Sequence, residues 1–350
     1  MREEIRVLCG RLSQAHALSE DEYKALIDAY SPETAACLAS LADAARRRVY
    51  GNRIYIRGLI EISNICRNNC LYCGIRRGNA GCERYRLSGE EILSACGEGY
   101  ALGFRTFVLQ GGEDPYFTDD VVCGIVRAIK AAYPDCAVTL SLGERSGESY
   151  ARLREAGADR YLLRHETADA AHYAMLHPGE MSFDHRMNCL HALRELGYQT
   201  GCGFMVGSPG QTSAHLVKDL KFVETFKPQM CGIGPFIPHA ATPFAGQPAG
   251  SAALTCYLLS IIRLIHPSVL LPATTALATI GSDGRERGIL AGANVVMPNL
   301  SPASVRRKYA LYNGKKSDGD ESAQEIAQLK RKMAAIGYEI VTDAGHYQAV

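Results

Sequence analysis

The feature that most constrains the fold of this chain is a regular alternation of short β-rich runs with longer helical segments. The candidate strands are residues 55–61, 105–110, 136–142, 159–164, 200–206, 230–236, 268–273 and 294–298. Helical segments at 88–102, 119–132, 147–156, 184–196, 212–226 and 251–265 fill the gaps between them. Eight strands that alternate with helices predict an α/β fold, a parallel sheet closed as a (β/α)8 TIM barrel. A doubly wound open sheet is the alternative, because the sequence alone does not show closure.

The segments on either side of this pattern are expected to be extensions of the barrel. Residues 1–49 predict an N-terminal helical extension, in which Ser31-Pro32-Glu33 has the cap, the proline and the acidic residue that begin a helix. The barrel is expected over residues 50–300. Residues 301–350 are expected to form a C-terminal extension packed on the barrel, with a polar surface loop at 313–324 and a final helix and strand-like end at 325–341.

The composition argues against some classes of partner. The 350 residues include 38 Lys and Arg against 37 Asp and Glu, so the overall charge gives no reason to expect nucleic acid or a membrane surface as a partner. The first residues are charged and amphipathic, without the apolar core of a secretory signal, and no run approaches the roughly 20 apolar residues that span a bilayer. A cytoplasmic protein is therefore expected.

Thirteen cysteines are many for such a chain, but their odd number and wide spacing do not suggest a disulfide framework. Most are expected to be small buried residues, such as Cys123 in a helical pattern and Cys202 in a strand pattern. Histidines in the helical stretches, among them His172 and His177, are expected at the surface. Only one group of cysteines is tightly spaced.

That group has the spacing C-x3-C-x2-C and comprises Cys66, Cys70 and Cys73, directly after the first predicted strand. In a barrel this position is the C-terminal face, where active sites lie. Three thiolates in so short a segment can bind three irons of a 4Fe-4S cubane and leave the fourth iron open. The pattern is typical of radical S-adenosylmethionine (SAM) enzymes, in which SAM fills the open position. A structural zinc site fits poorly, because it needs four ligands and Cys82 is a poor fourth.

Polar or glycine-rich motifs end several other predicted strands and so belong to the same face. Two glycines at 111–112 allow a ligand to approach the backbone closely, although a plain strand-to-helix turn is the alternative. After the fourth strand, Arg164 can hold a carboxylate by two parallel hydrogen bonds, and Glu166 can accept from hydroxyl or ammonium groups. Further candidates at strand ends are Met205, Thr274, Thr275 and Met297.

Longer blocks of the sequence resemble one family. The blocks ISNICRNNCLYCGIRR, VLQGGEDPY, EAGADRYLLRHET, GFMVGSPGQT and LPATTALATI are similar to the HydE maturases of FeFe-hydrogenase, over about residues 50 to 312. The resemblance implies a radical SAM (β/α)8 barrel with one 4Fe-4S cluster and SAM. It also implies an organometallic iron–cysteine complex as substrate, delivered by the maturase HydG, with HydF as a further partner and a reduced flavodoxin or ferredoxin as electron donor.

The resemblance assigns roles to individual residues. The cluster ligands are Cys66, Cys70 and Cys73. The SAM-binding residues are Tyr72, Gln110, Gly111, Gly112, Glu113, Glu166, Arg186 and Met205. The residues around anionic groups of the substrate are Thr139, Arg164, Thr274, Thr275 and Met297. One departure is that some family members carry an accessory C-terminal cluster on three cysteines, whereas the last cysteine here is Cys256, so that cluster is expected to be absent.

Two other functions stay open at this point. One is a different radical SAM reaction, such as that of a methylornithine synthase-like mutase, which would differ in the substrate cavity rather than in the cluster. The other is a non-catalytic iron-sulfur carrier or scaffold. The formation of 5′-deoxyadenosine from SAM separates an enzyme from a carrier.

Overall fold

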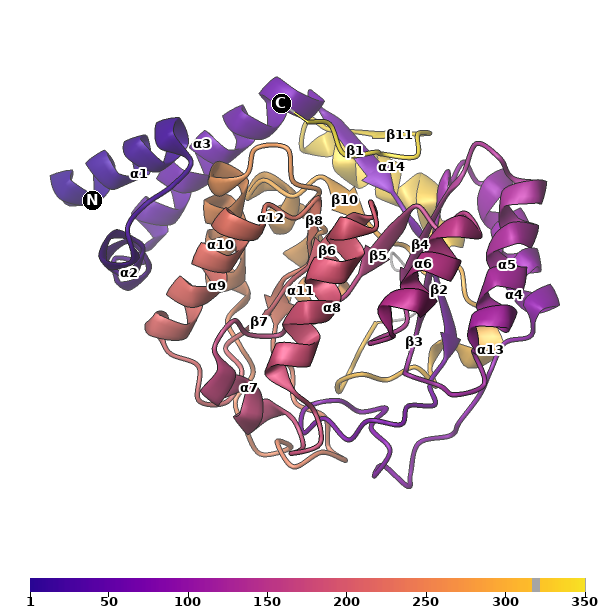
Figure 1. Cartoon of the computed structure of the whole chain (residues 1–350). Coiled ribbons are helices and arrows are strands. Elements are labelled where there is room, and N and C mark those ends of the chain that lie inside the picture. The colour runs from indigo at the N-terminus through magenta and orange to yellow at the C-terminus, as the bar shows by residue number, and fades with distance from the viewer. Residues whose placement is uncertain (317–321, 350) are drawn as a thin grey trace.

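The computed structural model describes residues 1–316 and 322–349, and it shows helices arranged around a parallel sheet (Figure 1). The helices are α1 (Glu3–Ala15), α2 (Glu20–Asp28), α3 (Pro32–Tyr50), α4 (Gly89–Ala101), α5 (Asp119–Ala132), α6 (Gly147–Glu155), α7 (Ala170–Leu176), α8 (Phe183–Glu195), α9 (Ser213–Phe226), α10 (Ala252–Ile265), α11 (Thr275–Ile280), α12 (Gly284–Leu290), α13 (Ala303–Arg306) and α14 (Ile326–Ala335). The strands are β1 (Arg53–Ile56), β2 (Gly58–Ser63), β3 (Thr106–Gly111), β4 (Ala137–Ser141), β5 (Arg160–Leu162), β6 (Gln199–Cys202), β7 (Met205–Val206), β8 (Met230–Cys231), β9 (Gly234–Pro235), β10 (Val295–Val296) and β11 (Glu339–Val341).

The strand pairings close the sheet into a barrel. Strands β2, β3, β4, β5, β6 and β8 lie side by side in that order, and every pairing is parallel. Single parallel bridges continue from β8 to residue 270 and from residue 272 to β10, and β10 pairs with β1. A last bridge joins Leu59 of β2 to Asn299, just after β10. The predicted barrel is thus confirmed over the described residues, and the open doubly wound sheet is wrong.

Several predicted strands are shorter or more broken than expected. The run 55–61 is two strands, β1 and β2, on either side of Arg57, and the runs 200–206 and 230–236 are each divided into two short strands. The run 268–273 makes only two isolated bridges, at Leu270 and Pro272. Proline has no N–H group to donate to a ladder, so Pro272 interrupts regular pairing.

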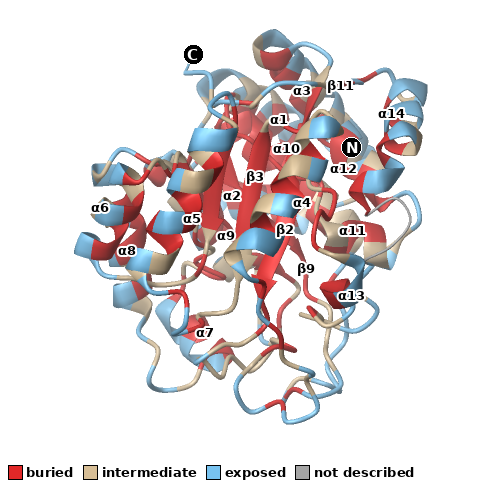
Figure 2. Cartoon of the chain, turned by 90° about the vertical axis from the view of Figure 1, so that its right-hand side faces the viewer, coloured by how far each residue is buried: buried red, intermediate tan, exposed pale blue. Residues whose placement is uncertain are grey.

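The helices follow the prediction closely because their first residues are strong caps. The hydroxyl of Ser88 accepts the backbone N–H of Glu91, and the Glu91 side chain returns to the N–H of Ser88, which together form a capping box at the start of α4. Thr118, Ser146 and Ser251 cap α5, α6 and α10 in the same way through their side-chain oxygens. The helices turn buried faces to the sheet and exposed faces outward (Figure 2).

Both chain ends pack on the barrel. Helix α3 packs against α10 and helix α2 against α9, and β11 pairs in parallel with β1. The residues after β11 cover the N-terminal end of the barrel. There the fully buried Arg160 guanidinium donates to the hydroxyl of Thr106 at 2.9 Å and to the carbonyl oxygens of Ala344 and Gly345 at 2.8 and 3.1 Å. The loop expected at 313–324 lies partly outside the described residues, at 317–321.

Among the described residues, no helix is both long and apolar enough to cross a membrane.

Candidate active site

The cysteine motif lies in the long loop that follows β2, at the C-terminal end of the barrel strands (Figure 1). Cys66, Cys70 and Cys73 are all free thiols and all half-buried. Burial raises the pKa of the Cys73 thiol to about 12, and burial, followed by the fields of Cys73 and Cys66, raises that of Cys70. The thiols are therefore neutral until a metal displaces their protons.

One arginine holds the two ends of this loop together. The Arg84 guanidinium donates to four backbone carbonyl oxygens, those of Asn64, Ile75, Arg76 and Asn79, at 2.6, 2.8, 2.7 and 3.2 Å. Asn64 precedes the first cysteine, and the other three residues follow the last. The cysteine loop is therefore held in shape by its own chain.

The glycines after β3 bring a second backbone close to the cysteine loop. A Cβ on Gly112 would lie 2.3 Å from the carbonyl oxygen of Ile65 and 2.8 Å from Cβ of Cys66. The N–H of Gly112 donates to the carbonyl of Ser63 at 3.0 Å, and the N–H of Arg67 donates to the carbonyl of Glu113 at 3.0 Å. Only glycine at position 112 permits this approach.

Tyr72 and Met205, both predicted to bind SAM, lie in one apolar cluster with Leu176 and Phe236. The hydroxyl of Tyr72 is 3.2 Å from Nε2 of His177. The other ring nitrogen of His177, Nδ1, is 2.9 Å from the carbonyl oxygen of Tyr173. Burial lowers the pKa of His177 to about 3, so the ring is neutral, with its proton on Nδ1 and Nε2 free to accept from Tyr72.

Glu166 stands in a backbone conformation that side chains rarely adopt, with φ of +66°. Two backbone hydrogen bonds to the next strand segment hold it there. The N–H of Glu166 donates to the carbonyl of Gly203 at 3.0 Å, and the carbonyl of Glu166 accepts from the N–H of Met205 at 3.2 Å. Strained positions of this kind are concentrated at functional sites. The pairing also places Glu166 beside Met205, another residue that is predicted to bind SAM.

Arg164 and Glu166 present unsatisfied polar atoms. Arg164 Nη2 and Glu166 Oε2 lie 3.1 Å apart as an ion pair without hydrogen-bond alignment, and both are buried atoms without a hydrogen-bond partner. Arg186 is buried behind them, ion-paired to Glu144 and donating to the carbonyl of Arg164 at 2.6 Å. Burial opposes its charge, but Tyr173 and Glu144 hold the pKa of the Arg186 guanidinium above its ordinary value.

Two of the predicted threonines also offer unused hydroxyls. Thr274 occupies the N-cap position of α11, yet its side chain makes no capping bond, and its Oγ1 is buried without a partner. Thr139, in the middle of β4, has a buried Oγ1 that is equally without a partner. Thr275 is the first residue of α11. Buried hydroxyls of this kind are satisfied by a polar ligand or by ordered water.

Gln110 and Met297 have contacts of their own within the chain. The amide of Gln110 donates to the hydroxyl of Tyr309 at 3.3 Å. Met297 packs against an apolar cluster that includes Tyr55 and Met230.

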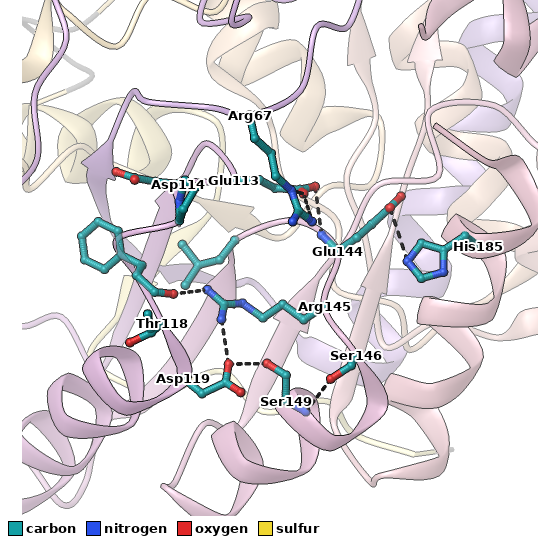
Figure 3. Close-up of a pocket in the computed structure, with 13 residues that line it drawn as sticks. Arg67, Glu113, Asp114, Thr118, Asp119, Glu144, Arg145, Ser146, Ser149 and His185 are labelled. Carbon is teal, nitrogen blue, oxygen red and sulfur yellow. Dashed lines mark hydrogen bonds and ion pairs between the residues drawn. The ribbon is translucent and has the colours of Figure 1, made fainter. Parts of the chain in front are cut away.

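Glu113 lines a polar pocket of about 390 Å³ between the turn after β3 and the loop after β4 (Figure 3). Its carboxylate is 2.8 Å from Arg67 and accepts the N–H of Glu144 at 3.0 Å. Across the pocket, Arg145 pairs with Asp119 and His185 with Glu144. The charged side chains that line the pocket therefore have partners of their own.

Three residues near the site were not predicted from the sequence: Glu144, His177 and Tyr309. His177 and His172, expected at helix surfaces, are both buried. Tyr309 is buried, and burial raises the pKa of its hydroxyl, with Glu61 and the cluster cysteines Cys73 and Cys66 adding to the effect. Glu144, in the block SLGER, carried the only usable signal, since a carboxylate directly after a predicted strand belongs to the barrel mouth.

Among the described residues, no three His, Cys, Asp or Glu side chains lie close enough together to hold a single metal ion. This observation does not bear on a cubane, in which each thiolate binds a separate iron. The donor set, three half-buried thiols in a loop fixed by Arg84, fits a 4Fe-4S cluster with one open iron. The unsatisfied atoms of Arg164, Glu166, Thr139 and Thr274 fit polar ligands nearby.

Comparison with known proteins agrees with this site. Residues 60–223 match the family model of the radical SAM superfamily. The chain is 50% identical to the FeFe-hydrogenase maturase subunit HydE of Thermotoga maritima, over 79% of each chain. The chain belongs to the HydE family of radical SAM enzymes. Membership implies a 4Fe-4S cluster and SAM as its cofactors.

Other members of the superfamily are more distant. The 3-methylornithine synthase of Methanosarcina acetivorans is 30% identical over 94% of this chain and 92% of its own. The crystal structure of methylornithine synthase superposes with a TM-score of 0.82 at 27% identity, over 95% of this chain and 97% of that one. The maturase HydG superposes with a TM-score of 0.80, but at 20% identity over 96% of this chain and 75% of that one, so this likeness shows the fold alone.

Proposed function

We propose that this protein acts in the maturation of FeFe-hydrogenase, where it cleaves SAM reductively and uses the products on a precursor of the hydrogenase cofactor. The observation that carries the proposal is the loop of three free cysteines at the barrel mouth, in a chain half identical to a HydE maturase. When bound, the cluster and SAM supply a 5′-deoxyadenosyl radical. The chain supplies ligands, orientation and exclusion of water.

Within this proposal, Cys66, Cys70 and Cys73 hold the cluster. Tyr72, Glu166, Arg186 and Met205 bind SAM, together with Gln110 and the segment Gly111, Gly112 and Glu113. Burial and the pairing with the segment after β6 hold Glu166 ready to accept from hydroxyl or ammonium groups. Arg186 keeps this arrangement in place through the backbone of Arg164.

The proposed substrate is an iron–cysteine complex, bound through anionic groups by Arg164, Thr139, Thr274 and Thr275, with Met297 as a further proposed substrate residue. A guanidinium can hold a carboxylate by two parallel hydrogen bonds, and a threonine hydroxyl adds a neutral donor. The buried atoms of Arg164, Thr139 and Thr274 that lack partners support this assignment.

We further propose a single cluster per chain, because no cysteine follows Cys256. The proposed partners are HydG, which would deliver the substrate, HydF, and a reduced flavodoxin or ferredoxin as electron donor. A reducing compartment, the cytoplasm, suits thirteen cysteines without a disulfide pattern and an oxygen-sensitive cluster.

A mutase reaction like that of methylornithine synthase is the second candidate, favoured by the likeness along nearly the whole chain. That reaction requires a lysine-like substrate held at both ends. Formation of methylornithine from lysine by the reconstituted protein would establish it, and its absence beside hydrogenase activation would exclude it. An iron-sulfur carrier would form no 5′-deoxyadenosine.

The proposed cluster is tested by anaerobic reconstitution and reduction with dithionite in the presence of SAM. We expect four irons per chain and formation of 5′-deoxyadenosine. Cys66→Ala, Cys70→Ala and Cys73→Ala should each abolish cleavage, whereas Cys123→Ala, in α5, should retain it. Cleavage by any of the first three variants, or about eight irons per chain, would contradict the assignment.

The proposed substrate anchor is tested by Arg164→Lys. An ammonium cannot reproduce the planar two-pronged geometry of the guanidinium, so we expect hydrogenase activation to fall at least about tenfold while the iron content is retained. The measurement is activation of apo-hydrogenase beside iron analysis of the same preparation. Activation equal to that of the parent would assign Arg164 a structural role as the partner of Glu166.

A further inference from the structure

A buried ion pair inside the barrel has no part in the proposed reaction. The Glu61 side chain, on β2, is fully buried, and its two carboxylate oxygens have separate partners. Lys315 Nζ lies 2.6 Å from Oε1, and the amide of Asn299 donates to Oε2 at 2.9 Å. The lysine side chain is only 8% exposed.

This pair lies next to the proposed cofactor site. Glu61 stands opposite Gln110 in the register of β2 and β3, so the two side chains lie on the same face of the sheet. Gln110 reaches the hydroxyl of Tyr309, and the Lys315 ammonium lies 5.2 Å from the centre of the Tyr309 ring. Cys73 and Cys66 also lie near enough to add to the raised pKa of the Tyr309 hydroxyl.

Lys315 reaches this position from a segment that crosses the barrel mouth, residues 308–316, here named the strap. Hydrogen bonds tie the strap to three parts of the mouth. On the cysteine loop, Asn64 Nδ2 donates to the carbonyl of Lys308 at 2.7 Å, and the N–H of Gly74 donates to that of Leu311 at 2.8 Å. The N–H of Asn313 donates to the carbonyl of Pro238, on the loop after β9, at 3.1 Å. The N–H of Lys316 donates to Oγ1 of Thr279, on α11, at 3.4 Å.

Apolar anchoring is confined to the first part of the strap, where Tyr309 is buried in the core and Leu311 packs against it, whereas Asn313, Gly314 and Lys316 are exposed. The one deeply buried charged group of the strap is Lys315. A buried carboxylate without a partner is costly, so Glu61 favours the state in which Lys315 is inserted. When the strap lifts, the ammonium returns to water, where it is well hydrated. The ion pair therefore stabilises the closed strap but still allows it to open reversibly.

We propose that the strap is a lid over the barrel mouth and that Lys315, through Glu61, is the positioning residue that holds it closed during the reaction. Substrate enters while the strap is lifted, and closure then excludes water from the cavity. The inference rests on the proposed function for the identity of the reaction, but the closed strap itself is a property of the chain.

The lid is tested by hydrogen–deuterium exchange of the full-length protein without cofactors, followed by mass spectrometry. In Lys315→Met, we expect the amides of residues 309–316 to exchange at least about tenfold faster than in the parent, because local opening no longer breaks an ion pair. Lys316→Met, an exposed neighbour in the same strap, is the matched control and should exchange like the parent. Unchanged exchange in Lys315→Met overturns the proposal.

A double variant guards against misfolding. Lys315→Met leaves a lone buried carboxylate, whereas Lys315→Met with Glu61→Gln leaves two neutral side chains and should fold. Because the two residues act as one pair, the double variant should open the strap no more than either single variant does. Faster exchange spread evenly over the barrel helices, instead of confined to the strap, would show general destabilisation and contradict a latch.

A second readout connects the strap to the reaction. With reconstituted holoenzyme, the ratio of 5′-deoxyadenosine formed to hydrogenase activated should rise several-fold in Lys315→Met and stay at the parent value in Lys316→Met. Faster exchange with an unchanged ratio would overturn the lid. Failure of the parent itself to cleave SAM would refute the proposed function, whereas the exchange experiment would still decide whether the pair closes the strap.

Discussion

At the scale of single residues, the site depends on atoms that the chain does not satisfy by itself and on one position without a side chain. Arg164, Glu166, Thr139 and Thr274 have buried polar atoms without a hydrogen-bond partner. Leaving such atoms unpaired costs stability, which is recovered when a ligand supplies the missing bonds. Gly112 contributes to the site because it has no side chain, which leaves room for the cysteine loop to pack against its backbone.

Gly112→Ala should therefore weaken the cluster. The new Cβ would overlap the carbonyl of Ile65 and Cβ of Cys66, both on the cysteine loop, so the loop must move. Overpacking of this kind costs about 1–3 kcal/mol, which corresponds to a loss of roughly 5-fold to 150-fold in cluster retention. The measurement is iron per chain after reconstitution and gel filtration.

Gly124→Ala is the matched control, because nothing lies within 4 Å of a Cβ at that position in α5. Its iron content should equal that of the parent. Full iron loading of Gly112→Ala would show that the cysteine loop can shift without loss of its ligands.

At the scale of elements, the cysteine loop has no regular secondary structure, but side-chain hydrogen bonds hold its conformation. Arg84 replaces the backbone ladder that the loop lacks, because its five donors can serve several carbonyl oxygens at once. The four carbonyl oxygens bound by Arg84 lie before and after the cysteine triplet. The loop is thus shaped before any iron binds.

Arg84→Lys should loosen this loop in the protein without cofactors. A lysine can replace some of the four bonds but not their planar arrangement, and hydrogen bonds from a charged donor contribute about 1.5–3 kcal/mol each. We expect limited proteolysis within residues 64–84 to accelerate at least about tenfold. Arg77→Lys, an exposed arginine of the same loop, should be cleaved at the parent rate. Equal rates for the two variants would show that the loop is held by its other contacts.

The elements also show where the sequence was sufficient. Helices α4, α5, α8 and α10 were predicted to within a residue, because local caps and periodicity determine where they begin. The run 268–273 formed no continuous strand, because its pairing depends on neighbours distant in sequence and on a proline. His177 was expected at the surface, because nothing in the local sequence shows that it would form a hydrogen bond with Tyr72, 105 residues away.

The same distinction applies to the site. Residues at strand ends, such as Arg164 and Glu166, could be placed at the barrel mouth because the fold determines where strands end. Lys315 could not, because its partner Glu61 is 254 residues away and the strap between them has no periodic pattern. Long-range ion pairs leave no local signal in a sequence.

At the scale of the whole molecule, the barrel is closed at both ends. The residues after β11 cover the N-terminal end, where they bind Arg160, and the strap and the cysteine loop cover the other. Two histidines at the ends of helices are also kept out of water, His177 after α7 and His266 after α10. His177 and His266 are both buried, and burial lowers their pKa values to about 3 and about 4.

These histidines make the stability of the protein dependent on pH. A histidine in the unfolded chain has a pKa near 6.5, so below that pH the unfolded state binds protons that the folded state does not bind. The contribution of each neutral histidine is present above about pH 6.5 and is lost progressively as the pH falls towards 3–4. His165 is buried too, but the pKa of its partner Asp219 is raised by burial, so the pair's two effects oppose each other.

We therefore expect the free energy of unfolding to fall by about 2 kcal/mol for each of His177 and His266 between pH 7 and pH 5. The measurement is urea unfolding of the protein without cofactors, under anaerobic conditions, at both pH values. His177→Gln should reduce that pH dependence by about 2 kcal/mol, because the unfolded state then gains one proton fewer. His191→Gln, which removes an exposed histidine on α8, should retain all of it. If the free energy of unfolding were the same at both pH values, His177 and His266 would have to be hydrated in the native state, contrary to their burial in the structure.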